Sequence, residues 1–276
     1  MRLLKQGKVK DVYEVDDHAL LFHFTNRVSA FDVVLPSEIP FKGEVLCRMT
    51  GFWFKVLNYP NHMIELIPPD KMLVKRLDII PVEFVVRGYL YGSLYERVLR
   101  NEAQVSIEPI LAAKLLEPIL DPTTKFEAKD RPVTRDEIVS RGWLSLDEYD
   151  ALEDVCIRIY QSMASRAEEK GFILADLKLE FGRDRDGRIL LADSIGPDEF
   201  RLWLKSTYKP GRRQESYDKQ PVRDWLESVG YKKALEEAVK LGRAIPPPPK
   251  LPEHIIAEVS KRYIEAFEKL TDEKFR

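Results

Sequence analysis

Residues 172–195 read FILADLKLEFGRDRDGRILLADSI, two strand-like runs joined at Asp186-Gly187. Polar and apolar residues alternate through the first run, which places Asp176, Lys178 and Glu180 on one face of a strand. Asp-Gly between two such runs is a strong signal for a two-residue hairpin turn. With that turn, Glu180 stands directly opposite Asp193 on the same face.

Two carboxylates held opposite each other repel unless they share a proton or a cation. The ligands are oxygens and Lys178 lies beside them, so we expect Mg²⁺ that bridges phosphates at Glu180 and Asp193. The alternative is a solvated hairpin whose charges face water. A loop longer by one residue would also shift the register and separate the pair. The metal site is favoured because these acids end an apolar strand and precede the loop 194–198, where active-site groups often lie.

The composition excludes several classes of protein. A chain of 276 residues is long for one domain and short for two, which favours one body of two lobes. With 44 basic and 46 acidic residues, the net charge of −2 gives no bulk attraction to nucleic acid or to an anionic membrane. The sequence has neither an apolar leader nor an apolar run of about 18 residues, so we expect a cytoplasmic protein. Cys47 and Cys156 lack the neighbours that a zinc site or a disulfide framework needs. Few amides beside 33% charged residues are typical of a thermophile.

The first part of the chain is predicted to be rich in strands. Residues 8–15 and 19–25 form an expected hairpin, and residues 44–58 an expected helix. Apolar strands follow at 72–77 and 82–87. We therefore predict an N-terminal β-rich lobe over residues 1–85 and a C-terminal α+β lobe over residues 86–276.

The second part is predicted to be mainly helical around the hairpin already described. A short helix is expected at 93–100, and a proline-punctuated loop at 118–132 is long enough to suggest function. Thr134 with Glu137, and Ser145 with Glu148, match capping boxes that open two helices. Three more helices are expected, at 221–229, 231–242 and 253–270. The last of these follows a stiff spacer at 246–249 and either packs back or mediates formation of a homo-oligomer.

Several basic residues are candidates for binding anions. Gly7, Lys8 and Lys10 stand at the head of a strand, where backbone amides and lysines are able to approach a triphosphate. Lys75 lies within the apolar strand MLVKRL, which delivers one lysine into the lobe. Arg87 ends the strand VEFVVR before Gly88, a position suited to a carboxylate or a phosphate. Gly7, Lys8, Lys10 and Lys75 are individually more typical of a turn or of a strand-edge charge, and Arg87 is the exception. The order of these parts is similar to that of protein kinases, but the kinase catalytic-loop and DFG sequences are missing.

The motifs taken together resemble the SAICAR synthetase (phosphoribosylaminoimidazole-succinocarboxamide synthase) family. They are GKVKDVY at 7–13, SAFD at 29–32, IPFKG at 39–43, LVKRLD at 73–78, VEFVVRGYLYGS at 82–93, DPTTK at 121–125, LADLKLEFG at 174–182, ADSIGPDEFRLW at 192–203 and DKQPVR at 218–223. The resemblance covers residues from about 7 to 225. It implies an α+β fold of two lobes, with a kinase-like N-terminal lobe and ATP in the cleft between the lobes. The implied reaction joins L-aspartate to the carboxylate of 5-aminoimidazole-4-carboxyribonucleotide (CAIR) and releases ADP and phosphate.

The resemblance also implies roles for individual residues. Those implied for ATP are Gly7, Lys8, Lys10, Val12, Lys75, Glu180 and Asp193. Those implied for the substrates are Ser29, Asp32, Lys42, Arg87, Ser93, Lys125, Asp176, Asp198, Arg201, Lys219 and Arg223. Those implied for catalysis are Lys178, Glu180, Asp193 and Arg87, with Mg²⁺ on Glu180 and Asp193. Ser29, Asp32 and Lys42 are expected in a loop that closes over the substrates.

The chain departs from the family pattern at two positions. Ser194 stands where many relatives carry an acidic residue, so metal ligation is expected to rest on Glu180 and Asp193. Gly196 replaces a common Ser or Thr. None of the four histidines falls in a motif, and none is assigned to catalysis.

Two other functions remain open from the residues. One is a kinase that uses the same ATP site on a hydroxyl acceptor, and the other is a nucleotide-binding module without turnover. A carboxylate is a poor electrophile, and its activation by phosphoryl transfer requires Mg²⁺, Lys and Arg to neutralise charge. The candidates are cations and paired acids, which suits this chemistry.

Overall fold

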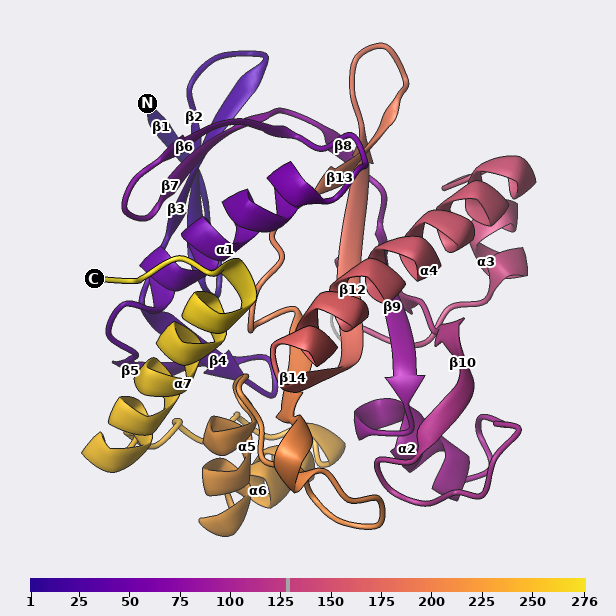
Figure 1. Ribbon diagram of the computed structural model, residues 1–276, viewed down its shortest axis with the longest axis vertical. Helices are drawn as coiled ribbons and strands as arrows, with labels where there is room; N and C mark the ends of the chain where they lie inside the picture. Colours follow the sequence, from indigo (N-terminus) through magenta and orange to yellow (C-terminus); the bar gives the residue numbers. More distant parts are fainter. Residues whose placement is uncertain (128–129) are drawn as a thin grey trace.

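The N-terminal part of the protein is a five-stranded antiparallel sheet. The computed structural model describes residues 1–127 and 130–276. The sheet order is β1-β2-β3-β7-β6. Its strands are β1 (Arg2–Gln6), β2 (Lys10–Glu14), β3 (Ala19–Phe24), β6 (Met63–Ile67) and β7 (Lys71–Lys75). Helix α1 (Lys42–Val56) packs against it, and β4 (Arg27–Ala30) pairs with β5 (Val33–Glu38) beside it (Figure 1).

A seven-stranded sheet forms the middle of the molecule. Its main order is β10 (Lys114–Leu120), β9 (Val82–Tyr89), β12 (Phe172–Arg183) and β13 (Ile189–Ala192). The short strand β11 (Thr123–Thr124) joins β9, while β8 (Asp78–Ile79) and β14 (Phe200–Leu204) join β12. Strand β12 has 12 residues, nearly all buried, because elements cover both of its faces.

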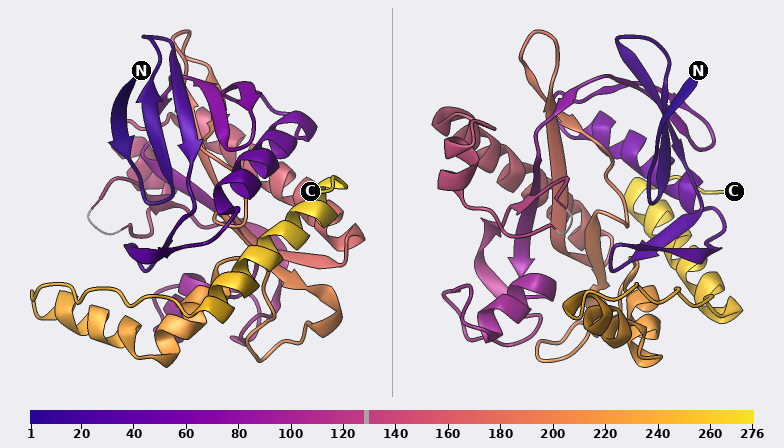
Figure 2. Two further views of the ribbon diagram at one scale, coloured as in Figure 1. Left: turned by 90° about the vertical axis from the view of Figure 1, so that its left-hand side faces the viewer. Right: turned by 180° about the vertical axis from the view of Figure 1, so that it is seen from behind.

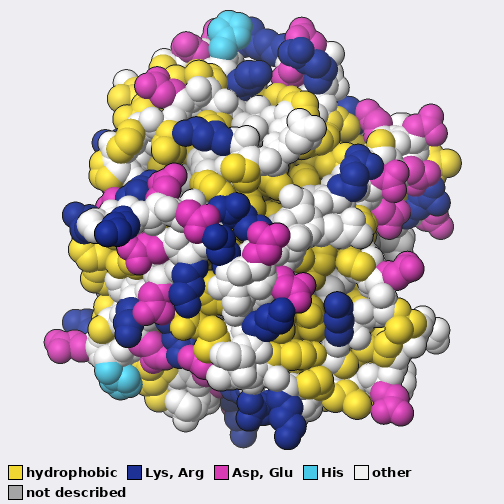
Figure 3. All heavy atoms as spheres, viewed as in Figure 1, with side chains coloured by type: hydrophobic (Ala, Val, Ile, Leu, Met, Phe, Trp, Pro, Cys, Tyr) yellow, Lys and Arg dark blue, Asp and Glu magenta, His cyan; other side chains and the backbone are white. Residues whose placement is uncertain are grey.

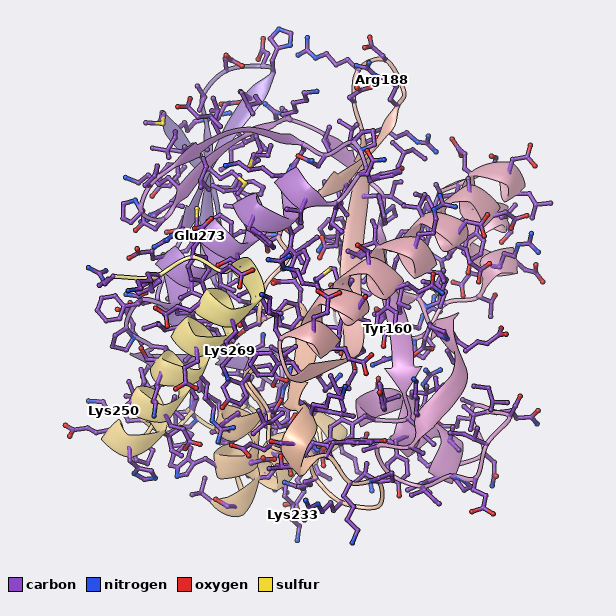
Figure 4. All side chains as sticks on the ribbon, viewed as in Figure 1. Tyr160, Arg188, Lys233, Lys250, Lys269 and Glu273 are labelled. Atoms are coloured by element: carbon purple, nitrogen blue, oxygen red, sulfur yellow. The ribbon has the colours of Figure 1, made fainter. Side chains whose placement is uncertain are left out.

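Helix α4 (Leu146–Glu169) covers one face of this sheet, with α3 (Arg135–Ser140) next to it. It begins at Ser145, where the predicted capping box with Glu148 is complete. Its buried stripe includes Leu152, Cys156 and Met163 at helical spacing, as predicted. Tyr160 projects from α4 (Figure 4) and donates a 2.7 Å hydrogen bond to the carbonyl of Leu174 on β12.

The C-terminal helices close the molecule on the other side. Helices α5 (Gln220–Ser228) and α6 (Tyr231–Lys240) form a pair that follows the 3₁₀ turn Lys205–Thr207, and α2 (Gly92–Leu99) follows β9. Helix α7 (Glu253–Thr271) returns to pack beside α1 and α5 (Figure 2). The last helix therefore bridges the N-terminal part and the α5–α6 pair.

Most predicted elements are confirmed. The hairpin of β2 and β3, helix α1, strands β7, β9, β12 and β13, and helices α2, α5, α6 and α7 lie where the sequence indicated. Strands β1, β4, β5, β6, β8 and β14 were not predicted. Residues 118–132 are not one loop, because β10 and β11 occupy part of that stretch. The lobe boundary near residue 85 stays a prediction, and the change from the first sheet to the second falls between Lys75 and Asp78.

The predicted register of the β12–β13 hairpin is wrong by one residue. Glu180 pairs with Ala192, and Asp193 lies beyond the strand with φ 63°. The loop has three residues, closed by Gly187 at φ 79° and by a 3.0 Å bond from the Asp184 amide to the Arg188 carbonyl. The Asp184 carboxylate also accepts the amides of Asp186 (3.0 Å) and Arg188 (2.9 Å), which stabilises the longer loop. Arg188 stands at the tip of this hairpin in Figure 4.

Candidate active site

A cavity of about 980 Å³ lies between the N-terminal sheet and the carboxyl half of β12. The loop before β2 contributes Gly7 and Lys8, and β2 itself contributes Lys10 and Val12. From the other side come Lys178 and Glu180 of β12 and the residues that follow β13. Both sheets therefore build this cavity.

Lysines from three segments converge on the two predicted carboxylates. Lys10 on β2 forms an ion pair with Asp193. Lys125 Nζ lies 2.7 Å from Glu180 Oε2, and Lys178 contacts the other oxygen of Glu180. Lys178 also lies 3.2 Å from Glu83 on β9. The cavity thus holds a compact cluster of alternating charges.

Asp193 is held at the centre of this cluster by its backbone and its neighbours. Burial opposes its charged form, but the charges of Lys10, Lys178 and Lys125 outweigh burial and lower its pKa. His62 Nε2 lies 3.2 Å from the backbone oxygen of Asp193. Burial lowers the pKa of His62 to about 4, so its ring is neutral near pH 7.

A second cavity of about 220 Å³ adjoins the first and is built around Arg87. Its guanidinium donates to Asp121 (3.0 Å), Asp176 (3.2 Å) and Ser93 (3.0 Å). Arg201 on β14 also binds Asp176. Burial opposes ionisation of Asp176, but Arg201 and Arg87 together lower its pKa. Two fixed arginines in a small cavity suit recognition of an anionic substrate.

Residues 198 and 199 belong to the wall that the two cavities share. Asp198 accepts from Lys42 (2.8 Å) and from the hydroxyl of Tyr263 on α7 (2.8 Å), and Lys219 lies 3.8 Å away. These cations outweigh burial and lower the pKa of Asp198. Among the described residues, no cation lies within ion-pair distance of the neighbouring Glu199, and burial together with the charge of Asp198 raises its pKa to about 7.

Comparison with known proteins decides the family. The family model for SAICAR synthetase matches residues 3–238. A relative from Nitrosopumilus maritimus, named phosphoribosylaminoimidazole-succinocarboxamide synthase, is 48% identical over 98% of both chains. The chain belongs to the SAICAR synthetase family. It is accordingly an ATP-dependent, amide-forming ligase of purine biosynthesis.

Solved structures of the family share this α+β fold. The SAICAR synthase of Saccharomyces cerevisiae, complexed with SAICAR, has a TM-score of 0.86 and 31% identity over 100% of this chain and 96% of its own. A SAICAR synthetase in complex with ADP has a TM-score of 0.75 and 26% identity over 99% of both chains. A second relative, from Thermoplasma volcanium, is 36% identical over the full length of both chains.

The cavities gather almost all the residues that the resemblance implied. The larger cavity is lined by Gly7, Lys8, Lys10, Val12, Ser29, Asp32, Lys75, Lys125, Lys178, Glu180, Asp193, Asp198, Lys219 and Arg223. The smaller one is lined by Arg87, Ser93, Asp176, Lys178, Asp198, Arg201 and Arg223. Ser29 and Lys42 differ from the expectation of a loop position. Ser29 lies in β4, and Lys42 lies in the first turn of α1 and is fully buried behind Asp198.

Four residues near the site were not predicted. Glu83, His62 and Glu199 line the larger cavity, and Tyr263 binds Asp198 from α7. Glu83 lies in the same strand as Arg87 and contacts Lys178. Positions 83 and 87 are an even number of residues apart, so the strand alternation of the sequence already placed both side chains on one face. The others come together only through tertiary contacts, so no spacing pattern marked them.

The donor set at Glu180 and Asp193 fits Mg²⁺. Both side chains are carboxylates in one cavity with lysines, and Mg²⁺ is commonly held by one or two carboxylates plus phosphate oxygens and water. Within residues 1–127 and 130–276, no three His, Cys, Asp or Glu side chains form a complete metal site. A cation here would therefore need oxygens from a bound nucleotide.

The outer surface is mixed in charge. On the face shown in Figure 3, Lys and Arg side chains are interspersed with Asp and Glu, as a net charge of −2 leads one to expect. No helix in the described part of the chain is long and apolar enough to cross a membrane.

Proposed function

We propose that the two adjoining cavities bind ATP and CAIR and join L-aspartate to the carboxylate of CAIR, giving SAICAR, ADP and phosphate. The larger cavity would take the triphosphate beside Gly7, Lys8 and Lys10. The smaller cavity would take the ribonucleotide on Arg87 and Arg201. The observation that carries this proposal is the shared wall, because it brings a cluster of lysines next to a pair of fixed arginines.

The chain's own residues would neutralise charge during phosphoryl transfer. Lys10, Lys125 and Lys178 are already gathered in the cavity by their ion pairs with carboxylates, so they lie close to the phosphates that they would neutralise. Mg²⁺, held by Glu180 and Asp193, would supply further neutralisation of the phosphate oxygens. Arg87 would hold the acceptor in line for attack.

The reaction would proceed through an acyl phosphate. A carboxylate oxygen of CAIR attacks the γ-phosphorus, and ADP leaves with the bond electrons. The amine of aspartate then attacks the activated carbonyl carbon, and phosphate leaves. This order makes a poor electrophile reactive before the amine arrives.

Isotope transfer tests this route. CAIR labelled with ¹⁸O in its carboxylate should deliver one labelled oxygen to the phosphate released with SAICAR. ADP release should require CAIR. Release driven by an alcohol acceptor would instead favour a kinase, and binding of ATP without any turnover would favour a nucleotide-binding module.

We propose a cytoplasmic homo-oligomer from a thermophile. Sedimentation would test its self-association, and a thermal melt would test its heat stability.

A further inference from the structure

Glu199 occupies a fixed position between the two cavities. It lies directly before β14, and its backbone amide donates a 2.9 Å bond to the Gly196 carbonyl. Its own carbonyl accepts a 2.7 Å bond from the amide of Lys178 on β12. The backbone therefore ties Glu199 to the strand that carries the charge cluster, and its side chain lines both cavities.

The carboxylate of Glu199 differs from the other acids of the site. Glu83, Asp176, Glu180, Asp193 and Asp198 each lie within ion-pair distance of a lysine or an arginine. Among the residues that the structure describes, Glu199 has no such partner. Its Oε1 accepts a 3.2 Å bond from the hydroxyl of Ser194, while its Oε2 is buried and has no hydrogen-bond partner within residues 1–127 and 130–276.

An unpaired buried carboxylate oxygen is costly, about 1–3 kcal/mol or more when charged. A Cβ added at Gly196 would stand 3.6 Å from Oε2 but only 2.8 Å from Leu46 Cδ2, so this side of the carboxylate is closely packed. A partner for Oε2 would have to come from the side of the cavities that Glu199 lines. A proton donor from a ligand in the cavities would satisfy this oxygen. A cationic donor would also supply the charge partner that the other acids already have.

We propose that Glu199 receives the α-ammonium group of L-aspartate and takes its proton as the amine attacks the acyl phosphate. This inference rests on the proposed function and deepens it, since it assigns the place of the amine. The amine must enter where the phosphate side and the ribonucleotide side meet, and Glu199 lies on the wall that both share.

The step balances in atoms and charge. The ammonium group gives one proton to the Glu199 carboxylate, and the freed lone pair forms the C–N bond to the acyl carbon. The C–O bond to phosphate breaks, and the phosphate leaves with the electron pair and the second amine proton. The products are the amide, hydrogen phosphate and protonated Glu199, which then returns its proton to solvent.

The charges that face Glu199 suit a proton acceptor. Lys178 and Lys10 favour its carboxylate form, while burial, Asp198 and Asp193 oppose that form. The balance raises its pKa to about 7, close to the optimum for a general base at neutral pH. The protonated carboxyl is unable to accept a proton, so ligation of aspartate should rise as pH increases through about 7.

Glu199→Gln tests the proposal with two nucleophiles. It keeps an acceptor for Ser194 but removes the base. With aspartate, kcat/KM should fall about 100-fold or more, and the rise through pH 7 should disappear. Hydroxylamine is uncharged near neutral pH and needs no base, so it should trap the acyl phosphate as a hydroxamate at the wild-type rate.

The outcomes separate this inference from the proposed function. Absence of hydroxamate with the wild-type protein would count against the acyl phosphate itself. Equal loss of both reactions in Glu199→Gln would make Glu199 a structural residue, and aspartate ligation within threefold of wild type would overturn its role as a base. Glu236→Gln on the exposed side of α6 is the matched control, and a thermal melt of each variant checks folding.

Discussion

The hydroxyl of Tyr263 donates a 2.8 Å hydrogen bond to Asp198. Tyr263 lies on α7, outside the segment that the family model matches, while Asp198 lines both cavities. The same carboxylate also binds Lys42 from α1. The final helix thus holds a residue of the site, although it contributes nothing to the cavity lining itself.

Tyr263→Phe should weaken catalysis without abolishing substrate binding. The substitution removes only the hydroxyl, and a hydrogen bond to a charged group contributes about 1.5–3 kcal/mol. Asp198 would keep its bond from Lys42 but lose the bond from the Tyr263 hydroxyl, so its carboxylate would be oriented less firmly. We therefore expect kcat/KM for CAIR to fall roughly tenfold. Ser260→Ala is the control, because it removes a 2.8 Å bond from the same helix to the Pro40 carbonyl. Equal effects of the two changes would mean that α7 acts only through packing.

Glu180→Gln should abolish most turnover. It removes the charge that Lys125 and Lys178 share and one of the two proposed ligands of Mg²⁺. We expect kcat to fall about 100-fold or more and the Mg²⁺ concentration needed for half-maximal rate to rise. Steady-state assays across a Mg²⁺ series would measure both, with Glu117→Gln on the exposed side of β10 as control. An unchanged Mg²⁺ dependence would remove Glu180 from the metal site.

His62 should make the folded state sensitive to acid. Burial lowers its pKa from 6.5 to about 4, so the unfolded chain binds a proton that the folded chain does not bind in this range. Its contribution is fully present above pH 6.5 and is lost as pH falls towards 4, with an upper limit of about 3 kcal/mol. Urea unfolding at pH 7 and pH 4.5 should therefore show a smaller loss for His62→Gln than for wild type. The exposed His254→Gln should behave as wild type, and identical losses in all three would contradict the prediction.

Gly88→Ala should destabilise the sheet beside Arg87. A Cβ at this position would stand 1.8 Å from the Tyr160 hydroxyl, which is bonded to the Leu174 carbonyl. Either that bond breaks or β9 moves, so the unfolding free energy should fall by about 2–4 kcal/mol. Gly142→Ala provides the contrast, since its φ is 69° but, apart from its chain neighbours, no atom of the described residues lies within 4 Å of the added Cβ. We expect a loss of only about 1 kcal/mol there. A thermal melt of the two variants would show their order.

The sequence predicted the elements better than their exact pairing. Periodicity and caps located β12, β13 and α4, because these signals are local. Asp186-Gly187 favours a two-residue loop but also permits a three-residue loop, which shifts the register by one residue. Asp184 decides that choice through its bonds to the amides of Asp186 and Arg188, and nothing in the alternation of the strands encodes it.

The candidate site was predictable where its residues lie in motifs. Lys178 and Glu180 share one strand face, and that relation follows from the pleat. Glu199 and Tyr263 were missed for a physical reason. Glu199 differs from the other acids of the site in having no ion-pair partner among the described residues. Tyr263 contacts Asp198 from a position 65 residues further along the chain. Neither property exists before the chain has folded.

In the larger cavity, Lys10, Lys125 and Lys178 are paired with the carboxylates of Asp193 and Glu180, so these charges neutralise one another. An anion that enters alone must pull Lys10 from Asp193 and Lys125 from Glu180, and it leaves two bare carboxylates behind. A nucleotide that brings its own divalent cation offers a replacement counter-ion for each acid that it displaces. The cavity should therefore resist inorganic phosphate and metal-free nucleotide, and its ion pairs should open mainly for the complete metal–nucleotide complex.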